Sequence, residues 1–151
     1  MEPGATDIES LRAALEARQE VAFAYLFGSA SSGRRHGQSD VDVAVWVYPD
    51  ALEAGEGRNI GTDLWIDLWG VAERSLPGQQ VDVVLLHRAP PLLADRVVRF
   101  GKVLFSRDEQ RRIQWVVETK ARYCDLKPLH RMLDAVVTDR VRTGRFGKTY
   151  D

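Results

Sequence analysis

The chain has 151 residues, of which 44% are hydrophobic and 28% charged, and its formal net charge is −1. This composition is typical of a single globular domain and gives no charge argument for binding to nucleic acid. The single cysteine, Cys124, excludes an internal disulfide. Because no apolar run has transmembrane length and no signal pattern opens the chain, we expect a cytoplasmic protein without membrane contact.

A helix and two strands are predicted in the first 48 residues. The helix opens with a capping box, in which Thr6 caps the first turn and Glu9 reaches back to it, and it ends near Arg18. Two apolar runs with β-branched and aromatic residues predict buried strands at residues 21–27 and 41–48. The segment between the two strands is rich in glycine and serine and predicts turns.

A loop and four further elements follow. Residues 49–58 combine a proline, glycines and acidic residues, and they predict the loop. The four elements are a helix at 59–74, a strand at 81–86, a short helix that begins at Pro90-Pro91 and ends at Gly101, and a strand at 102–106. On the short helix, we expect Leu93, Val97 and Phe100 to face the core.

From Arg107 onward the spacing of the apolar residues is helical throughout. One apolar face runs as far as Cys124 and a different one follows it. Two helices are therefore predicted, with Asp125 capping the second and Pro128 in its first turn. The expected fold class is α/β: a small mixed β-sheet flanked by helices, with a C-terminal helical pair.

Two aspartates lie at the start of the predicted strand at 41–48. Side chains alternate along a strand, so Asp40 and Asp42 point to the same face, where two carboxylates repel each other unless a cation binds them. Asp82 stands near the start of the next strand, and if the two strands are neighbours the three carboxylates converge. Such a set suits two Mg²⁺ ions, which prefer oxygen ligands. Turn-forming aspartates are the alternative, credible for Asp40 and Asp82 but weak for Asp42.

Gly28 and Ser29 end the first strand, and the predicted turns separate them from Asp40. A backbone that approaches a triphosphate closely favours glycine, and a hydroxyl with nearby amides can bind phosphate oxygens. A glycine–serine pair is common in turns, so its value lies in its place between the strand and the acids. No Gly-Lys-Ser/Thr sequence follows, which excludes a Walker motif.

These residues resemble the signature of the DNA polymerase β-like nucleotidyltransferases. The matching positions are Gly28-Ser29, Gly33 and Ser39-Asp40-Val41-Asp42, with Asp82 as the third acid, whereas Ser31 stands where the signature often has a small apolar residue. The small size and the tail are most similar to the minimal nucleotidyltransferase (MNT) antitoxins that are paired with HEPN ribonuclease toxins. The resemblance implies a nucleotidyltransferase core at 1–106 and a C-terminal helical extension at 107–151, packed on the core in the same domain.

The resemblance also implies a reaction, the transfer of AMP from ATP to a tyrosine hydroxyl of the cognate HEPN toxin, with no direct need for nucleic acid. Asp40 and Asp42 would hold the Mg²⁺ ion at the ATP phosphates, and all three aspartates would hold a second ion. Asp82 would also assist deprotonation of the attacking hydroxyl. The nucleotide-binding residues would be Gly28, Ser29 and Ser39, of which the first two bind the β- and γ-phosphates and Ser39 orients the acids.

Two other functions stay open. A small-molecule nucleotidyltransferase of the aminoglycoside type would carry out similar chemistry, but such proteins usually have a C-terminal domain larger than this tail. An antitoxin that neutralises its partner by binding alone would not need the intact set Asp40, Asp42 and Asp82. For the other polar and aromatic candidates we favour structural roles: an exposed turn for Arg34, Arg35 and His36, an edge lysine for Lys102, and the core for Trp46, Trp65, Trp69 and Trp115.

Overall fold

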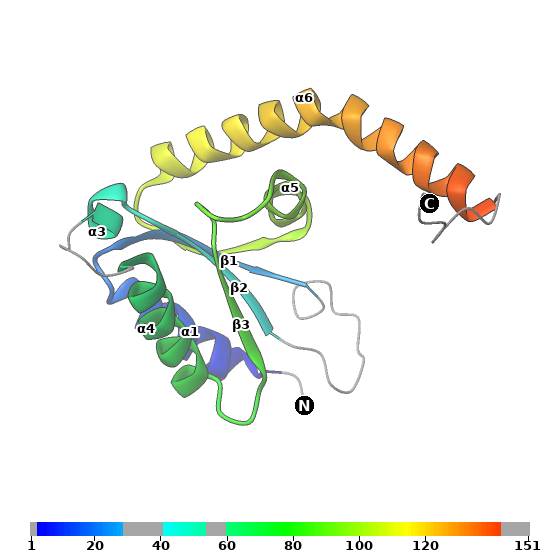
Figure 1. Cartoon of the computed structure of the whole chain (residues 1–151). Coiled ribbons are helices and arrows are strands. Elements are labelled where there is room, and N and C mark those ends of the chain that lie inside the picture. Colours follow the sequence, from blue (N-terminus) through cyan, green and yellow to red (C-terminus); the bar gives the residue numbers. More distant parts are fainter. Residues whose placement is uncertain (1–2, 29–40, 54–59, 143–151) are drawn as a thin grey trace.

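The computed structural model describes residues 3–28, 41–53 and 60–142. A four-stranded sheet with the order β3-β2-β1-β4 forms its centre (Figure 1). Strand β1 (Val21–Phe27) is antiparallel to β2 (Val41–Val47) and to β4 (Lys102–Ser106), whereas β3 (Val81–Leu85) is parallel to β2. The predicted strands and the mixed sheet are confirmed, and β3 and β4 are the edges of the sheet.

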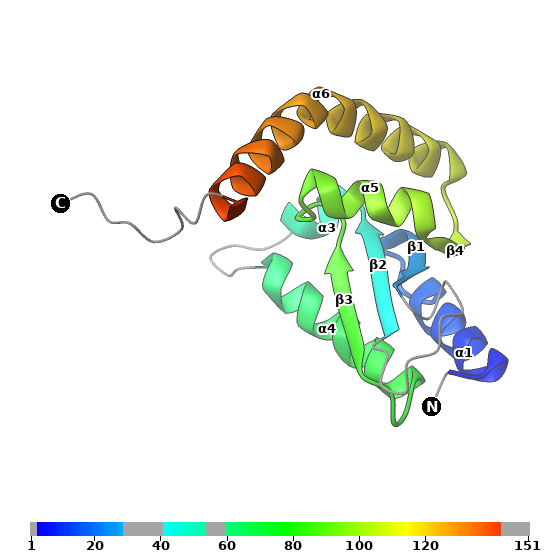
Figure 2. The same cartoon turned by 90° about the vertical axis from the view of Figure 1, so that its right-hand side faces the viewer.

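Helices cover both faces of the sheet (Figures 1 and 2). The helices α1 (Ala5–Glu16) and α4 (Ile60–Ser75) pack on one face, and α5 (Pro91–Phe100) and the first half of α6 (Glu109–Arg142) pack on the other. The described part of the chain has no helix that is both long and apolar enough to cross a membrane.

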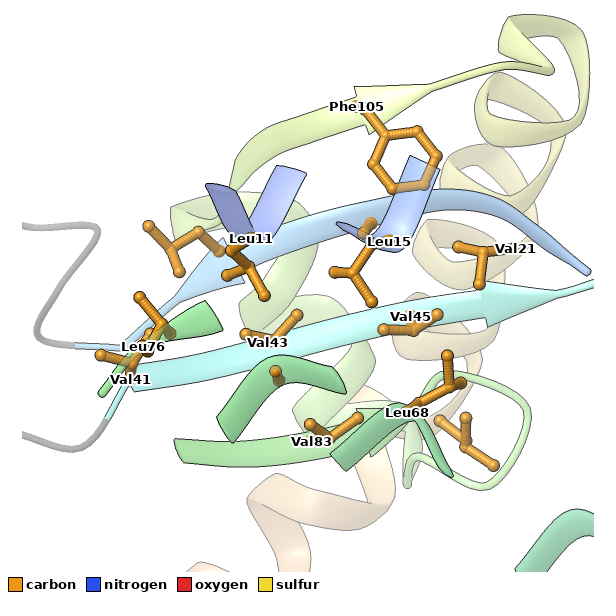
Figure 3. Packing of buried hydrophobic residues seen from close by; sticks show 14 of the residues in the cluster. Leu11, Leu15, Val21, Val41, Val43, Val45, Leu68, Leu76, Val83 and Phe105 are labelled. Carbon is orange, nitrogen blue, oxygen red and sulfur yellow. The ribbon is translucent and has the colours of Figure 1, made fainter. Parts of the chain in front are cut away.

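The strand β2 supplies side chains to both cores. Its four valines at positions 41, 43, 45 and 47 are fully buried against Leu11, Leu15 and Leu68 (Figure 3). The alternate residues Ala44 and Trp46 join the second core. Burial of each large apolar side chain contributes about 1.5–3 kcal/mol, so a one-residue slip of β2 would exchange the two faces at a high cost. The alternation therefore fixes the face on which Asp42 lies.

The start of α1 differs from the prediction. Gly4 is the N-cap, and its N–H donates to Asp7 Oδ2 at 3.0 Å, so the predicted pairing of Thr6 and Glu9 is wrong. Glu9 is instead paired with Arg12, one turn along the helix. Glycine has no side chain to cap the helix, and the Asp7 carboxylate places a negative charge in the first turn and accepts the N–H of Gly4.

Two other local predictions need correction. The predicted loop at 49–58 contains the short helix α3 (Pro49–Glu53), in agreement with the preference of proline for the first helical turn. Phe100 is 65% exposed, not inward-facing, whereas Val97 is fully buried as predicted. Phe100 is the last residue of α5, where the backbone of Gly101 comes close to the Tyr25 ring as the chain turns into β4. The turns predicted between β1 and β2 lie outside the described residues.

The predicted C-terminal helical pair is wrong, because α6 is one helix of 34 residues with Pro128 in its interior. Asp125 is consequently a helical residue and not a cap. Among the side chains that the structure describes, none after Thr119 is buried, and the second half of α6 extends beyond the other elements (Figure 1). A second helix would have had to fold back and bury its apolar residues, and here they remain exposed.

Candidate active site

The acids predicted at the starts of two strands meet at one end of the sheet. The parallel strands β2 and β3 begin at the same end, and their register pairs Asp42 with Asp82. Neighbouring strands lie about 4.8 Å apart, and side chains at paired positions point to the same face. Asp42 is half-buried and Asp82 is exposed, and alternation along β2 places them on the face that α5 and α6 cover further along.

The end of β1 also lies beside Asp42, on the side of β2 opposite to β3. Phe27 pairs with Asp42 across the antiparallel strands, and the following residue, Gly28, has a φ of +80°. A Cβ built on Gly28 would overlap Oδ2 of Asp42, so glycine is required here both by the left-handed backbone and by the close approach. From the sequence we expected the backbone at Gly28 to approach a triphosphate closely. In the structure the group that lies close to Gly28 is the carboxylate of Asp42.

The remaining predicted residues of the site are not all described. Asp40, Ser29 and Ser39 lie outside the described residues. Within the described ranges, no group of three or more His, Cys, Asp or Glu side chains is placed to hold a metal ion, and only two of the three predicted acids fall in those ranges. Those two, Asp42 and Asp82, form a pair of like charges that a divalent cation would stabilise.

Lys102 begins β4 at the same end of the sheet. Its register partner is Leu26, whose side chain belongs to the core on the α1 and α4 face. Paired residues of neighbouring strands share a face, so Lys102 lies on the opposite face from Asp42. This placement favours the interpretation of Lys102 as an exposed lysine of an edge strand.

The tryptophans divide into two pairs. Trp46 and Trp115 are in the core with Phe23 and Tyr25, as predicted. Trp65 is only half-buried and Trp69 is exposed, so the prediction of a core position is wrong for Trp69. Both side chains of this second pair donate their indole N–H to carbonyl groups of β3, and their rings are stacked 6.5 Å apart.

A buried carboxylate that the sequence reasoning missed holds α6 against α5. Asp95 is 2% exposed, accepts a hydrogen bond from Lys120 Nζ at 2.9 Å and forms an ion pair with Arg99 Nε at 2.8 Å. Its position between Ala94 and Val97 on the buried face of α5 was the available signal. An acid on an apolar helix face requires a partner, and here the partners bridge two helices.

A second polar contact fixes the start of α6 on β1. Arg112 Nη1 donates to the hydroxyl of Tyr25 at 2.8 Å, and the same guanidinium is paired with Glu109. The hydrogen bond from Arg112 lowers the pKa of Glu109 to about 2, so the ion pair is formed throughout the neutral range. These contacts place α6 over the sheet face that ends in Asp42.

Comparisons with known proteins agree with this arrangement. Residues 9–110 match the family model described as polymerase beta, nucleotidyltransferase. The protein adenylyltransferase MntA of Shewanella oneidensis is 33% identical to the chain over 105 residues, which cover 68% of this chain and 66% of that relative, or just under two thirds of its length.

Solved structures give the same result over more of the chain. A chain of a toxin–antitoxin crystal structure with AMP-PNP has a TM-score of 0.63 at 26% identity, with 87% of this chain and 98% of that chain covered. A complex of a tri-AMPylated Shewanella oneidensis HEPN toxin with an MNT antitoxin gives 0.60 at 25% identity, with 87% and 96% covered. The predicted resemblance to this antitoxin group is thereby confirmed.

The match to the family model runs from α1 to the start of α6 and includes the residues that form the described part of the site, Gly28, Asp42 and Asp82. The fold, a mixed sheet with helices on both faces, is that of the similar solved structures. The chain therefore belongs to the polymerase β nucleotidyltransferase family.

Proposed function

We propose that the chain is the antitoxin of a toxin–antitoxin pair and transfers AMP from ATP to a tyrosine hydroxyl of its partner, a HEPN toxin. The observation that carries this proposal is the pairing of Asp42 with Asp82 on parallel strands, with Gly28 packed against Asp42. Support comes from relatives of the chain, one named a protein adenylyltransferase and another solved in complex with a tri-AMPylated HEPN toxin.

The residues of the site fit Mg²⁺. Asp42 and Asp82 offer carboxylate oxygens on one face, and Asp40 precedes Asp42 by two residues, the spacing that puts strand residues on the same face. In this proposal Asp40 and Asp42 hold one ion, and the three aspartates together hold a second. When bound, the two ions stabilise negative charge on the attacking and leaving oxygens of the transfer.

The chain's own residues position the reactants. Gly28 and Ser29 bind the β- and γ-phosphates of ATP, and Ser39 orients the acids. The tyrosine oxygen forms a bond to the α-phosphorus as the bond from that phosphorus to the bridging oxygen breaks, and diphosphate leaves. Asp82, the more exposed of the two described acids, accepts the proton of the tyrosine hydroxyl.

A protein acceptor is supported by the second half of α6. Four apolar side chains on this half are exposed, and they follow the spacing of one helical face: Leu129, Met132, Leu133 and Val136. A free helix of this length gains little stability by itself in water, and Pro128 weakens it further. We propose that the toxin covers this face, since similar chains were solved in toxin–antitoxin complexes.

Labelled ATP tests the proposal directly. The chain is incubated with α-labelled ATP, Mg²⁺ and the product of the neighbouring gene, and label is expected on a tyrosine of that partner. Asp42→Asn should abolish the transfer, whereas Glu73→Gln, a change of an exposed acid on α4, should leave it intact. Label on an aminoglycoside and not on the partner would favour the small-molecule enzyme. Full neutralisation of the partner by Asp40→Ala/Asp42→Ala, without any transfer, would favour binding alone.

A further inference from the structure

Strand β3 carries Asp82 at an edge of the sheet, where it pairs with β2 on one side only. In the parallel pair, Leu86 N–H donates to Val45 O, so the even-numbered residues of this stretch bond toward β2. The backbone groups of Val81 and Val83, on either side of Asp82, therefore point away from the sheet. An edge strand has no neighbouring strand to bond such groups, so its position depends on what else they bind.

Two tryptophans of α4 bond to these outward groups. Trp69 Nε1 donates to Val81 O at 3.0 Å, and Trp65 Nε1 donates to Val83 O at 2.6 Å. The two carbonyls flank Asp82, and the two indole rings are stacked on each other. The indoles therefore supply hydrogen bonds that a further strand would otherwise give to β3.

The spacing of the two tryptophans matches the spacing of the two carbonyls. Helix α4 lies alongside β3 (Figures 1 and 2). Four residues of a helix rise by about 6 Å, and two residues of a strand extend by about 6.6 Å. Trp65 and Trp69 are one turn apart on one side of α4, so both indoles reach the edge at once. Leu68 and Ala72, on the adjacent side, are fully buried in the core, and this burial fixes the rotation of α4.

The side chains that flank Asp82 restrain the strand further. Val83 is buried, and Val81 packs against the same core on the face that α1 and α4 cover. Because side chains alternate along a strand, Asp82 points to the opposite face, where Asp42 has the paired position. The hydrogen bonds from the indoles and the packing of the valines thus hold the backbone on both sides of this carboxylate.

We propose that Trp65 and Trp69 are positioning residues for Asp82, and that they hold the edge strand so that its carboxylate stays beside Asp42 in the Mg²⁺ site. This inference rests on the proposed function and deepens it, because it assigns a role in the site to residues of α4. The tryptophans act through the backbone, since their N–H groups bond to main-chain carbonyls. Residues that orient a metal ligand typically change metal affinity about 10–100-fold when removed, and we expect the lower end for this indirect contact.

Amide hydrogen exchange in the ligand-free protein tests the restraint on β3 without a measurement of activity. Trp65→Phe and Trp69→Phe keep an aromatic ring and remove the N–H donor. The amides of Asp82 and Val84 should exchange about fivefold faster in each variant, which is the effect of one hydrogen bond of typical net strength on local opening. Exchange in β4, at the opposite edge of the sheet, should be unchanged. If Trp65→Phe does not fold, the more exposed Trp69→Phe decides the test. Unchanged exchange of both amides would overturn the proposal.

A ¹⁵N NMR titration with Mg²⁺, at a fixed concentration of an unreactive ATP analogue, tests the effect on the metal site. Trp65→Phe and Trp69→Phe should each bind Mg²⁺ about tenfold more weakly than the wild type, and a higher Mg²⁺ concentration should restore AMP transfer. Trp115→Phe is the matched control, because it makes the same chemical change in the core between α6 and β1, and its Mg²⁺ affinity should be that of the wild type.

The titration separates this inference from the proposed function. Binding of Mg²⁺ by the wild type, with equal affinity in Trp65→Phe and Trp69→Phe, would overturn the positioning role and leave the proposed function intact. A tenfold loss in Trp115→Phe as well would assign the effect to general loss of packing and would also overturn the role. Absence of Mg²⁺ binding by the wild type would contradict the proposed function, and this inference with it.

Discussion

Gly28 and Asp42 are packed so closely that a Cβ at position 28 would overlap the Oδ2 atom of Asp42. Because Asp42 pairs with Asp82 on the neighbouring strand, this contact fixes one carboxylate of the proposed metal site from the end of β1. A side chain at position 28 would have to displace the Asp42 carboxylate, because Gly28 directly follows Phe27, the register partner of Asp42.

We therefore predict that Gly28→Ala abolishes AMP transfer and destabilises the fold. The backbone at φ +80° costs about 1–2 kcal/mol for a residue with a Cβ, and the overlap with Asp42 adds to that cost. Gly78→Ala is the matched control, because Gly78 has a φ of +78° with no atom within 4 Å of the built Cβ. Urea denaturation should show a lower free energy of unfolding for both variants. The transfer assay should show a loss of activity for Gly28→Ala alone.

Asp42→Asn is predicted to remove stabilisation by Mg²⁺ with an unreactive ATP analogue. For the wild type, ligand at about 100 times its dissociation constant should raise the free energy of unfolding by about 2.7 kcal/mol, and a thermal melt detects this increase. In the protein without ligands, the variant also loses the repulsion between the two like charges at the paired positions 42 and 82. An equal response of wild type and Asp42→Asn to Mg²⁺ and the analogue would contradict this assignment of the site.

The strands and the two described acids could be predicted because their signals are local. The apolar runs of β1 and β2 identify buried strands, and the alternation of β2 places its valines on one face and Asp42 on the other. The sequence could not establish that β3 lies beside β2, on which the meeting of Asp42 and Asp82 depends. The order of the strands depends on how the helices pack on both faces of the sheet, and the residues around the two aspartates give no signal of this packing.

The errors have a related origin. Asp125 and Pro128 have the spacing of a helix start. A second helix would also need a surface against which to pack, and because it lacks one the chain continues as the single helix α6. Thr6 and Glu9 likewise match a capping box, but Glu9 pairs with Arg12. The partners of Asp95 are missed for a further reason, since Lys120 is 25 residues away in the sequence and is brought close by packing.

The contact of Lys120 with Asp95 gives a third prediction, that Lys120→Met destabilises the protein by about 1–3 kcal/mol. Asp95 is 2% exposed, so removal of one of its two cationic partners leaves a buried carboxylate with less compensation. Arg142→Met is the control, because it breaks an exposed ion pair with Asp139 at the end of the same helix, worth about 0–1 kcal/mol. Equal midpoints of urea denaturation for the two variants would show that Asp95 does not hold α6 to α5.

The second half of α6 gives the last prediction, that Leu133→Asp prevents assembly with the partner toxin. Leu133 is 51% exposed and lies one turn after Leu129 on the apolar face that we propose the toxin covers. A charge at the centre of such a contact removes apolar burial and leaves an uncompensated carboxylate, which costs about 2–5 kcal/mol of binding, or a 30-fold or greater loss of affinity.

The free protein should scarcely respond to this change, because surface substitutions shift the free energy of unfolding by about 0.5 kcal/mol or less. Thr138→Asp adds the same charge at an exposed polar position of the same half-helix and serves as the control. Calorimetry with the purified toxin should then show weakened binding for Leu133→Asp and near-normal binding for Thr138→Asp. Equal affinities of the two variants would mean that the toxin does not bind this face of α6.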